Sequence, residues 1–329
     1  MTIRRNIHCM LVDLHSDTVF ALWSDSSKGD LLSSSLSIDK KKLTEGGVTG
    51  QCFALFTPMY EHVPEKHQGK TPWEILNELH EIFLLETEKA GIPQMMKADD
   101  LLSGKLHAVL TTEEGAAIEG DISRLSVLKD WGVKIFGITW NYENELGYPN
   151  SSDPLIMSKG LKEKGIEAVE ECERLGIIVD VSHLSDGGFM SVAEHSRKPF
   201  IATHSNSRTV TGVSRNLTDY ELRILADHGG VTGLNFCPAF LHDEKAEREE
   251  DAESRIEDMV RHVMHIYRTA GADVLAIGTD FDGISGKLEI PTPERIYLLR
   301  DALSKAGLGE SVLDRMWGLN ALRVFREVE

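Results

Sequence analysis

The chain has 329 residues, of which 41% are hydrophobic, and it carries a formal net charge of −18. A surface of that sign repels nucleic-acid and anionic lipid phosphates, so we expect no nucleic-acid partner. The chain has no run of about 18 apolar residues, and no apolar segment follows the arginines of MTIRRNIHCM, so we expect a cytoplasmic protein with no membrane partner. The four cysteines, Cys9, Cys52, Cys172 and Cys237, stand singly and favour reduced thiols over a disulfide framework.

Short apolar runs alternate with longer amphipathic segments along the chain, which is the pattern of repeated β-α units around a parallel sheet. Eight runs are typical of strands, and eight is the strand number of a (β/α)8 barrel. They cover 9–15, 48–55, 107–113, 134–140, 177–183, 200–204, 231–236 and 274–280. We therefore predict an α/β fold of the TIM-barrel type, with one domain over residues 1–329.

Helix signals fall between these runs. Gly91 is placed to end the first long helix, and Glu221 completes a capping box at the start of a later one. The predicted helices cover 73–91, the segment from Thr218, 255–270 and 309–327. The segment 56–72 shows no clear element, and we interpret it as a loop over the barrel mouth, because long loops in compact domains are often functional.

Polar residues gather at one end of the predicted strands. In a barrel the C-terminal ends of the strands meet at one mouth, where barrel enzymes place their sites. The residues at or just beyond these ends are His15, Asp17, Glu113, Glu114, Asn141, His183, His204 and Asp280. Imidazoles with carboxylates suit zinc and similar ions, and the surplus over the three ligands of one catalytic zinc indicates two ions.

Each of these features has a simpler interpretation when it is taken alone. An H-x-D sequence such as His15 to Asp17 is usually a turn or a cap, and Glu114 could complete a helix capping box. His183 and His204 could be structural histidines at strand ends. The joint placement of these residues at the same end of separate strands is what favours a metal site.

Two ions that share a bridging carboxylate would hold a hydroxide between them. Metal coordination lowers the pKa of water from about 15.7 toward about 7, and the ions also polarise a carbonyl. A further carboxylate could take the proton of the attacking water and pass it to a leaving amine. The residues therefore favour hydrolysis of an amide.

Six segments resemble the motifs of the membrane (renal) dipeptidase family, in the same order. They are LVDLHSDTVF, EGGVTGQ, TTEEGA, GIIVDVSHLS, ATHSNSRTVTGVSRNL and AIGTDFDGI. The resemblance runs from residue 10 to the WGLNALRVFREVE ending and is specific in its combination of H-x-D, SH and HS elements. It implies a (β/α)8 barrel with two zinc ions that cleaves dipeptides, L,D-dipeptides included. In lacking a secretion signal, the chain resembles the bacterial, intracellular branch of the family. A homodimer is expected from the habit of the family.

The resemblance also implies a set of metal ligands. His15 and Asp17 would bind one zinc ion, and His183 and His204 would bind the other. Manganese and cobalt suit the same ligands, and availability usually decides among these metals.

Either of two adjacent glutamates could be the ligand that bridges the two ions. Glu114 matches the family's E-G step, because Gly115 follows it. Glu113 is the alternative. We expect Glu114 to be the bridging ligand.

Two further residues match functional positions, and one position departs from the family. Asp280 matches the acid that handles the protons of the water and the amine, and Arg215 matches the arginine that holds the substrate carboxylate, with Arg208 as a nearby competitor. Mammalian members have a histidine after the fourth strand, where this chain has Trp140 or Asn141. Asn141 could donate an N–H to the developing oxyanion, but it cannot carry a positive charge.

Two other functions compete with dipeptide hydrolysis. One is a related binuclear amidohydrolase that acts on another small amide or an N-acyl amino acid. The other is a barrel that binds metal or ligand without turnover, although a pure binder needs no proton carrier such as Asp280. Neither G-x-G-x-x-G nor a P-loop sequence is present, which disfavours a nucleotide-dependent enzyme.

Overall fold

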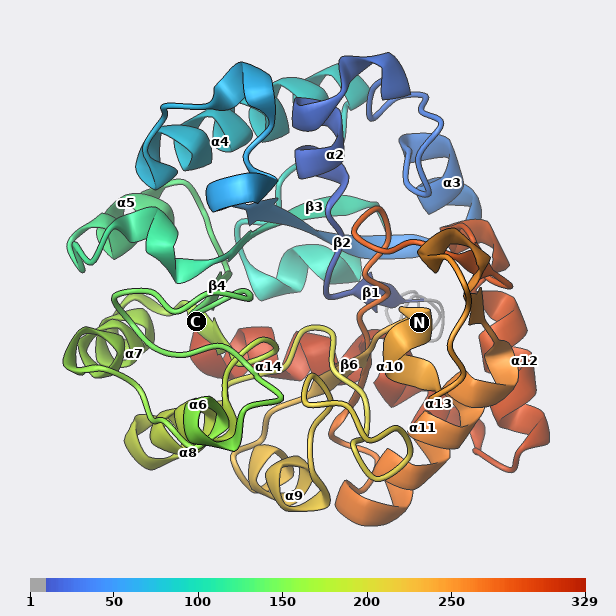
Figure 1. Ribbon diagram of the computed structural model, residues 1–329. Helices are drawn as coiled ribbons and strands as arrows, with labels where there is room; N and C mark the ends of the chain where they lie inside the picture. The colour runs from blue at the N-terminus through green and yellow to red at the C-terminus, as the bar shows by residue number, and fades with distance from the viewer. Residues whose placement is uncertain (1–9) are drawn as a thin grey trace.

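The computed structural model describes residues 10–329, and its centre is a curled parallel sheet in the order β5-β4-β3-β2-β1-β8-β6 (Figure 1). All neighbouring strands of this sheet pair in parallel. The strands are β1 Leu11–Asp13, β2 Val48–Phe56, β3 His107–Glu113, β4 Ile135–Gly137, β5 Ile178–Asp180, β6 Thr232–Leu234 and β8 Leu275–Ile277. The predicted α/β barrel is confirmed, while Cys9 of the first predicted run lies outside the described residues.

The predicted strand over 200–204 is reduced to two bridges, which close the barrel between β5 and β6. Ile201 pairs in parallel with Asp180, and Ala202 pairs in parallel with Thr232. The Thr203 carbonyl oxygen that follows them packs closely against the neighbouring strands. A Cβ at Gly233 would lie 1.9 Å from that oxygen. Glycine at this position therefore permits the close approach.

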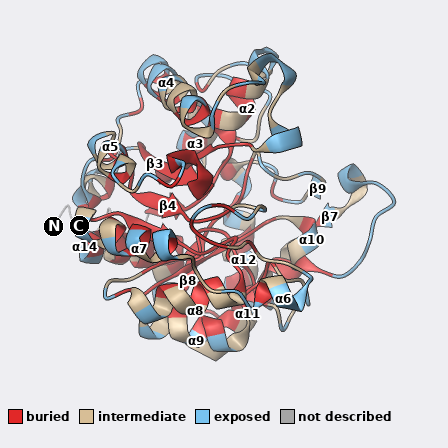
Figure 2. Cartoon of the chain, turned by 60° about the vertical axis from the view of Figure 1, so that its left-hand side comes forward, coloured by how far each residue is buried: buried red, intermediate tan, exposed pale blue. Residues whose placement is uncertain are grey.

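Strand side chains alternate between the barrel interior and the layer beneath the helices. Each of the eight predicted runs contributes at least one buried side chain to an inner cluster that also contains residues of α14. These side chains include Val12, Cys52, Val109, Ile135, Ile178, Ile201, Val231 and Ala276. Their neighbours along the strands, such as Ala108 and Leu110, belong to a larger cluster beneath the helices. Figure 2 shows the buried strands at the centre and the exposed outer faces of the helices.

Helices surround the sheet, and most predicted boundaries are confirmed. The α-helices are α2 Thr18–Ser24, α3 Lys40–Glu45, α4 Pro72–Ala90, α5 Arg124–Asp130, α6 Pro154–Met157, α7 Glu163–Leu175, α8 Asp186–His195, α9 Asp219–Asp227, α10 Pro238–Leu241, α11 Ile256–Ala270, α12 Tyr297–Lys305, α13 Glu310–Asp314 and α14 Asn320–Val328. Gly91 ends α4 with a φ of 61°, and Thr218 and Glu221 form the predicted capping box of α9. The helix predicted over 309–327 is divided by a π-helical turn at Arg315–Leu319.

Short elements occupy the connections. The 3-10 turns are η1 Ser26–Lys28, η2 Tyr60–His62, η3 Glu65–His67, η4 Ala98–Ser103, η5 Gly115–Ile118, η6 Glu249–Asp251 and η7 Pro293–Arg295, and a second small sheet pairs β7 Glu253–Ser254 with β9 Lys287–Leu288. Cys52 and Cys172 are buried free thiols, and Cys237 is a partly buried one. Over residues 10–329, the helices fall short of the length and apolar content that a bilayer crossing requires.

A buried histidine on α11 ties together two of the loops at the mouth of the barrel. The backbone N–H of Ser207 donates to His262 Nδ1 at 3.1 Å, and His262 Nε2 lies 3.0 Å from the Leu241 carbonyl oxygen. Burial lowers the pKa of His262 from 6.5 to about 4. The imidazole is therefore neutral in the folded protein at neutral pH.

We expect His262→Gln to flatten the dependence of stability on pH between 6.5 and about 4. In the unfolded chain this histidine takes up a proton as the pH falls below 6.5, whereas the folded protein resists protonation down to about pH 4. The wild type therefore loses stability across this window, by up to about 3 kcal/mol at 1.4 kcal/mol per pKa unit. Urea unfolding between pH 7 and pH 4, with chelator present and His195→Gln as the control, measures the difference. Identical pH slopes for wild type and His262→Gln would contradict it.

Candidate active site

A cavity of about 420 Å³ opens at the C-terminal ends of the strands. This size is typical of a site for a small ligand. Its polar lining includes six of the residues predicted from the sequence: Asp17, Glu113, Asn141, His183, His204 and Asp280. The segment 56–72, predicted to be a loop over the mouth, contributes Phe56 and His62 to the same cavity.

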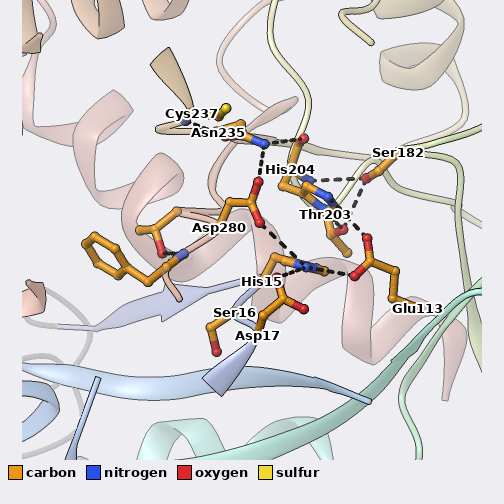
Figure 3. Close-up of polar contacts among 12 residues, drawn as sticks. His15, Ser16, Asp17, Glu113, Ser182, Thr203, His204, Asn235, Cys237 and Asp280 are labelled. Carbon is orange, nitrogen blue, oxygen red and sulfur yellow. Dashed lines mark hydrogen bonds and ion pairs between the residues drawn. The ribbon is translucent and has the colours of Figure 1, made fainter. Parts of the chain in front are cut away.

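Glu113 lies at the centre of the polar floor. It is the last residue of β3, and its carboxylate is placed among three imidazoles. Its Oε1 lies 2.9 Å from His183 Nε2 and 3.6 Å from His204 Nε2, while its Oε2 lies 3.4 Å from His15 Nε2. Figure 3 shows Glu113, His15 and His204 converging on one point. The two oxygens of one carboxylate thus face different histidines.

Two aspartates complete the cluster on the side of His15. Asp17 Oδ2 lies 3.5 Å from His15 Nε2, and Asp280 Oδ1 lies 3.9 Å from the same nitrogen. Three overlapping groups have donor atoms close enough together to hold a cation, namely His15 with Asp17 and Glu113, Glu113 with His183 and His204, and His15 with His204 and Asp280. The first two groups share Glu113, which gives the arrangement two neighbouring positions with one common carboxylate.

The residues present fit a metal centre, because three buried carboxylates gather around the imidazoles. Burial raises the pKa of Glu113 to about 7 and that of Asp280 to about 6. Among residues 10–329, no hydrogen-bond partner is found for two buried atoms of the cluster, His15 Nε2 and Asp17 Oδ1. Buried polar atoms without partners are costly, and divalent cations between these groups would satisfy them.

Two of the imidazoles are oriented by acceptors on their far sides. Asn141 Oδ1 lies 3.1 Å from His183 Nδ1. Thr203 Oγ1 lies 2.7 Å from His204 Nδ1 and donates its own proton to Asp180 Oδ2 at 2.6 Å. With Nδ1–H donated in both rings, the Nε2 lone pairs face each other at 3.0 Å and both face Glu113. This is the tautomer that ligates a metal through Nε2.

The predicted bridging role of Glu114 needs correction, because the structure does not bring its carboxylate to the cluster. Glu114 Oε1 accepts hydrogen bonds from Ala116 N at 2.7 Å and from Asn144 Nδ2 at 2.6 Å, and Oε2 accepts one from Trp140 N at 3.0 Å. These bonds cap η5 and hold the segment that follows β4. These contacts support the simple capping interpretation of Glu114, and Glu113 is the glutamate whose carboxylate faces the histidines.

The alternation of β3 contains the signal that distinguishes the two glutamates. Val109 points into the barrel interior, whereas Ala108 and Leu110 point toward the helices. Side chains two residues apart share a face of a strand, so Glu113 lies on the inner face with Val109. Glu114, with a φ of 83°, has already left the strand.

Asp280 is held in a tight turn after β8. Asn235 Nδ2 donates to its Oδ2 at 2.8 Å, which leaves Oδ1 directed toward His15 (Figure 3). The φ of Asp280 is 64°, in the left-handed region that non-glycine residues rarely adopt. The turn also places the Phe281 carbonyl to accept from Asp17 N at 2.9 Å. The turn therefore aligns the two aspartates with each other.

The two candidate arginines are clearly distinguished. Arg208 forms a bidentate pair with Asp186, with both distances 2.8 Å, and so is already engaged. Arg215 is buried, donating to Ser205 Oγ at 2.6 Å and to the His204 carbonyl oxygen at 3.1 Å. Its Nε finds no hydrogen-bond partner among the described residues, and its guanidinium lies 5.5 Å from the ring centre of Phe240 in the cavity wall.

Trp140 and Asn141, the two candidates for the position of the family histidine, both line the cavity. The ring of Trp140 lines the cavity, with its centre 4.8 Å from that of Phe56 and 5.1 Å from that of His62. Asn141 contacts His183 through its oxygen, so its position favours orientation of this histidine over the predicted N–H donation to an oxyanion. No motif in the segment 56–72 marks His62 or Phe56 as parts of the site.

Comparisons with known proteins agree with this geometry. The family model described as membrane dipeptidase (Peptidase family M19) matches residues 5–329. The chain belongs to the membrane dipeptidase family. An uncharacterised relative from Klebsiella pneumoniae, described as a protein in the pqqA 5′ region, is 34% identical over 231 residues, which cover 68% of this chain and 83% of the relative.

Solved structures of dipeptidases share the fold. A metallopeptidase from Rhodobacter sphaeroides, solved with a phosphinate mimic of the dipeptide L-Ala-D-Ala, matches with a TM-score of 0.86 and 25% identity, over 97% of this chain and 99% of that one. A structure described as dipeptidase AC matches with a TM-score of 0.85 and 26% identity, over 97% and 98% of the two chains. As a member of the membrane dipeptidase family, the chain is a metal-dependent hydrolase.

Proposed function

We propose that this chain cleaves dipeptides and uses two divalent cations held side by side at the mouth of the barrel. Zinc is the metal that we expect first. The observation that carries the proposal is the carboxylate of Glu113, whose two oxygens face separate histidines. His15 and Asp17 would hold one cation, and His183 and His204 would hold the other. Glu113 would contact both cations.

The chemistry is hydrolysis of the amide between the two residues of the substrate. Divalent cations bound at these ligands lower the pKa of water and polarise a carbonyl. Asp280 Oδ1, directed into the cluster, takes the proton of the water as its oxygen bonds to the carbonyl carbon. Asp280 then returns this proton to the amine nitrogen as the C–N bond breaks. A carboxyl pKa raised to about 6 by burial suits both transfers near neutral pH.

Arg215 would recognise the free carboxylate of the substrate. Its guanidinium is buried next to His204 and the cavity-lining Phe240, and its Nε lacks a hydrogen-bond partner within the described part of the chain. A planar, permanently charged guanidinium is suited to binding a carboxylate. A fixed cation near the reacting amide limits the substrate to one residue beyond that amide, which favours dipeptides.

Recognition of the substrate through its carboxylate also bears on the configuration of the second residue. The Rhodobacter sphaeroides relative was solved with a mimic of L-Ala-D-Ala. We infer that the present chain also accepts D-configured C-terminal residues, because its predicted recognition of that residue depends on the carboxylate.

The experiment is hydrolysis of paired L,L and L,D dipeptides by zinc-loaded protein, with the metal content measured and chelated protein as the control. The proposal expects cleavage that disappears on chelation and two metals per chain. Failure to cleave any dipeptide by protein confirmed to hold two metals would favour an amidohydrolase that acts on another small amide.

We expect Arg215→Met to raise KM for dipeptides by about 100-fold, with a smaller change in kcat. Loss of a charge-assisted bidentate pair costs about 2–3 kcal/mol, which corresponds to this factor. Arg208→Met, which removes the pair with Asp186 and the hydrogen bonds to the Ser214 and Asn216 carbonyl oxygens, is the control on the nearby arginine. An unchanged KM for Arg215→Met with a raised KM for Arg208→Met would assign the carboxylate to the other arginine.

A further inference from the structure

Four aromatic rings form one side of the cavity, and we call Phe20, Phe56, His62 and Trp140 the aromatic wall. All four line the cavity. Their ring centres are 5.0 Å apart for Phe20 and Phe56, 4.8 Å for Phe56 and Trp140, and 5.1 Å for Trp140 and His62. They come from α2, the end of β2, η2 and the segment after β4. The wall is therefore a continuous surface built from separate parts of the chain.

A second layer of contacts holds the outer part of the wall in place. Tyr142 donates its hydroxyl to Glu61 Oε1 at 2.8 Å, and the ring of Tyr142 lies 5.0 Å from that of Tyr60. These contacts connect η2 to the segment after β4 outside the cavity. They position His62, whose side chain is 46% exposed, at the rim of the cavity beside Trp140.

The wall and Arg215 lie on opposite sides of the metal-ligand cluster. The wall is built on the connections that follow β1, β2 and β4, whereas Arg215 follows Ile201–Ala202 and packs on Phe240 of α10. The sheet order places β4, β3 and β2 on one side of β1 and β8 and β6 on the other. Figure 1 shows β4 and α10 on opposite sides of the barrel centre.

This placement sets the direction of a bound dipeptide. With its carboxylate at Arg215 and its amide at the cluster, the amino-terminal residue extends toward the aromatic wall. Flat apolar surface lines that end of the cavity, and aromatic faces pack well on apolar and aromatic groups.

We propose that the aromatic wall binds the side chain of the amino-terminal residue and selects dipeptides in which that side chain is large and apolar or aromatic. The inference rests on the proposed dipeptidase function and on the role of Arg215 in it. Trp140, at the centre of the wall, is the main determinant of the selection. Where mammalian members have a histidine, this chain has Trp140 or Asn141, and the wall provides an apolar binding surface at this place.

The test compares L,L dipeptides that differ only in the first residue: Gly-Ala, Leu-Ala and Phe-Ala. Burial of a large apolar side chain predicts kcat/KM for Leu-Ala and Phe-Ala about 10- to 100-fold above that for Gly-Ala. Trp140→Ala removes most of this ratio and Trp140→Phe keeps most of it. Tyr220→Ala, which removes an exposed aromatic ring from α9, leaves the ratio unchanged. Ala-Gly and Ala-Phe test the second residue, for which the proposal expects no dependence on Trp140.

Binding separates this inference from the proposed function. Calorimetry with phosphinate mimics of Gly-Ala and Phe-Ala measures recognition without turnover. If no dipeptide is cleaved but the Phe-Ala mimic binds more tightly than the Gly-Ala mimic, the proposed reaction is contradicted. The aromatic wall would then still be supported as a recognition surface. Equal binding of both mimics, or a ratio unaffected by Trp140→Ala, would overturn the inference. If Trp140→Ala loses metal, the inference is tested with His62→Ala, at the exposed rim of the cavity. An unchanged kcat/KM ratio between Phe-Ala and Gly-Ala in His62→Ala would also overturn the inference.

Discussion

Glu113→Gln is expected to lower metal affinity by more than about 100-fold and to abolish dipeptide hydrolysis, since loss of an outer partner of a metal ligand alone costs about 10- to 100-fold. The carboxylate of Glu113 faces His15 with one oxygen and His183 and His204 with the other. The amide of Gln has one oxygen and no negative charge, so it cannot neutralise two cations. Metal content after dialysis against weak chelator measures the effect, with hydrolysis of the best substrate alongside.

Glu114→Gln is the matched control on the adjacent residue. Its carboxylate accepts three hydrogen bonds within the protein, and a Gln amide group facing these donors leaves one of them unpaired. We expect a loss of stability of about 1–3 kcal/mol with two metals retained. The opposite result, metal loss in Glu114→Gln and retention in Glu113→Gln, would restore Glu114 as the bridging ligand.

Asp280→Asn is expected to lower kcat by about 100- to 10,000-fold, because a positioned proton carrier contributes a factor of this size. The variant keeps an oxygen that can accept from Asn235, so the turn after β8 is retained, but its amide cannot take up the proton of the attacking water. KM changes less than kcat, because the substrate carboxylate is recognised elsewhere. Steady-state kinetics on metal-loaded variant measures both constants.

The metal content of Asp280→Asn distinguishes a proton carrier from a ligand. Asp280 also belongs to a group with His15 and His204 that could hold a cation. Retention of two metals with loss of turnover supports the proton transfer, whereas loss of one metal assigns Asp280 to coordination. Asp282→Asn is the nearby control, because this carboxylate accepts from Thr18 Oγ1 and Ser37 N, both at 2.7 Å, and lies outside the three groups.

Much of the barrel was predictable because its signals are local. Apolar runs of strand length identified all eight positions of the barrel wall, and the capping box at Thr218 located the start of α9. The run 200–204 was predicted as a full strand, but it forms two bridges, and its Thr203 carbonyl packs closely on Gly233 of a neighbouring strand. That contact joins distant parts of the chain and leaves no mark on the local pattern.

The aromatic wall shows a similar limit for the site. From the sequence, Trp140 was recognised only as one of two residues, with Asn141, at the position of a family histidine. Phe56 and His62 were not singled out, since no spacing connects residues on separate connections. Their rings meet because β2 and β4 lie near each other in the sheet, on either side of β3.

The sequence by itself determined the barrel class, the family resemblance and the residues His15, Asp17, His183, His204 and Asp280 as members of one site. It did so because the chain direction of parallel strands brings all their C-terminal ends to one mouth. Only the tertiary structure decided which of two adjacent glutamates faces the histidines, which arginine pairs with Asp186, and which atom of Asn141 meets His183. These choices depend on the direction in which each side chain points and on the partner it meets across the barrel. Such contacts are set by packing between strands and loops that are far apart in the chain.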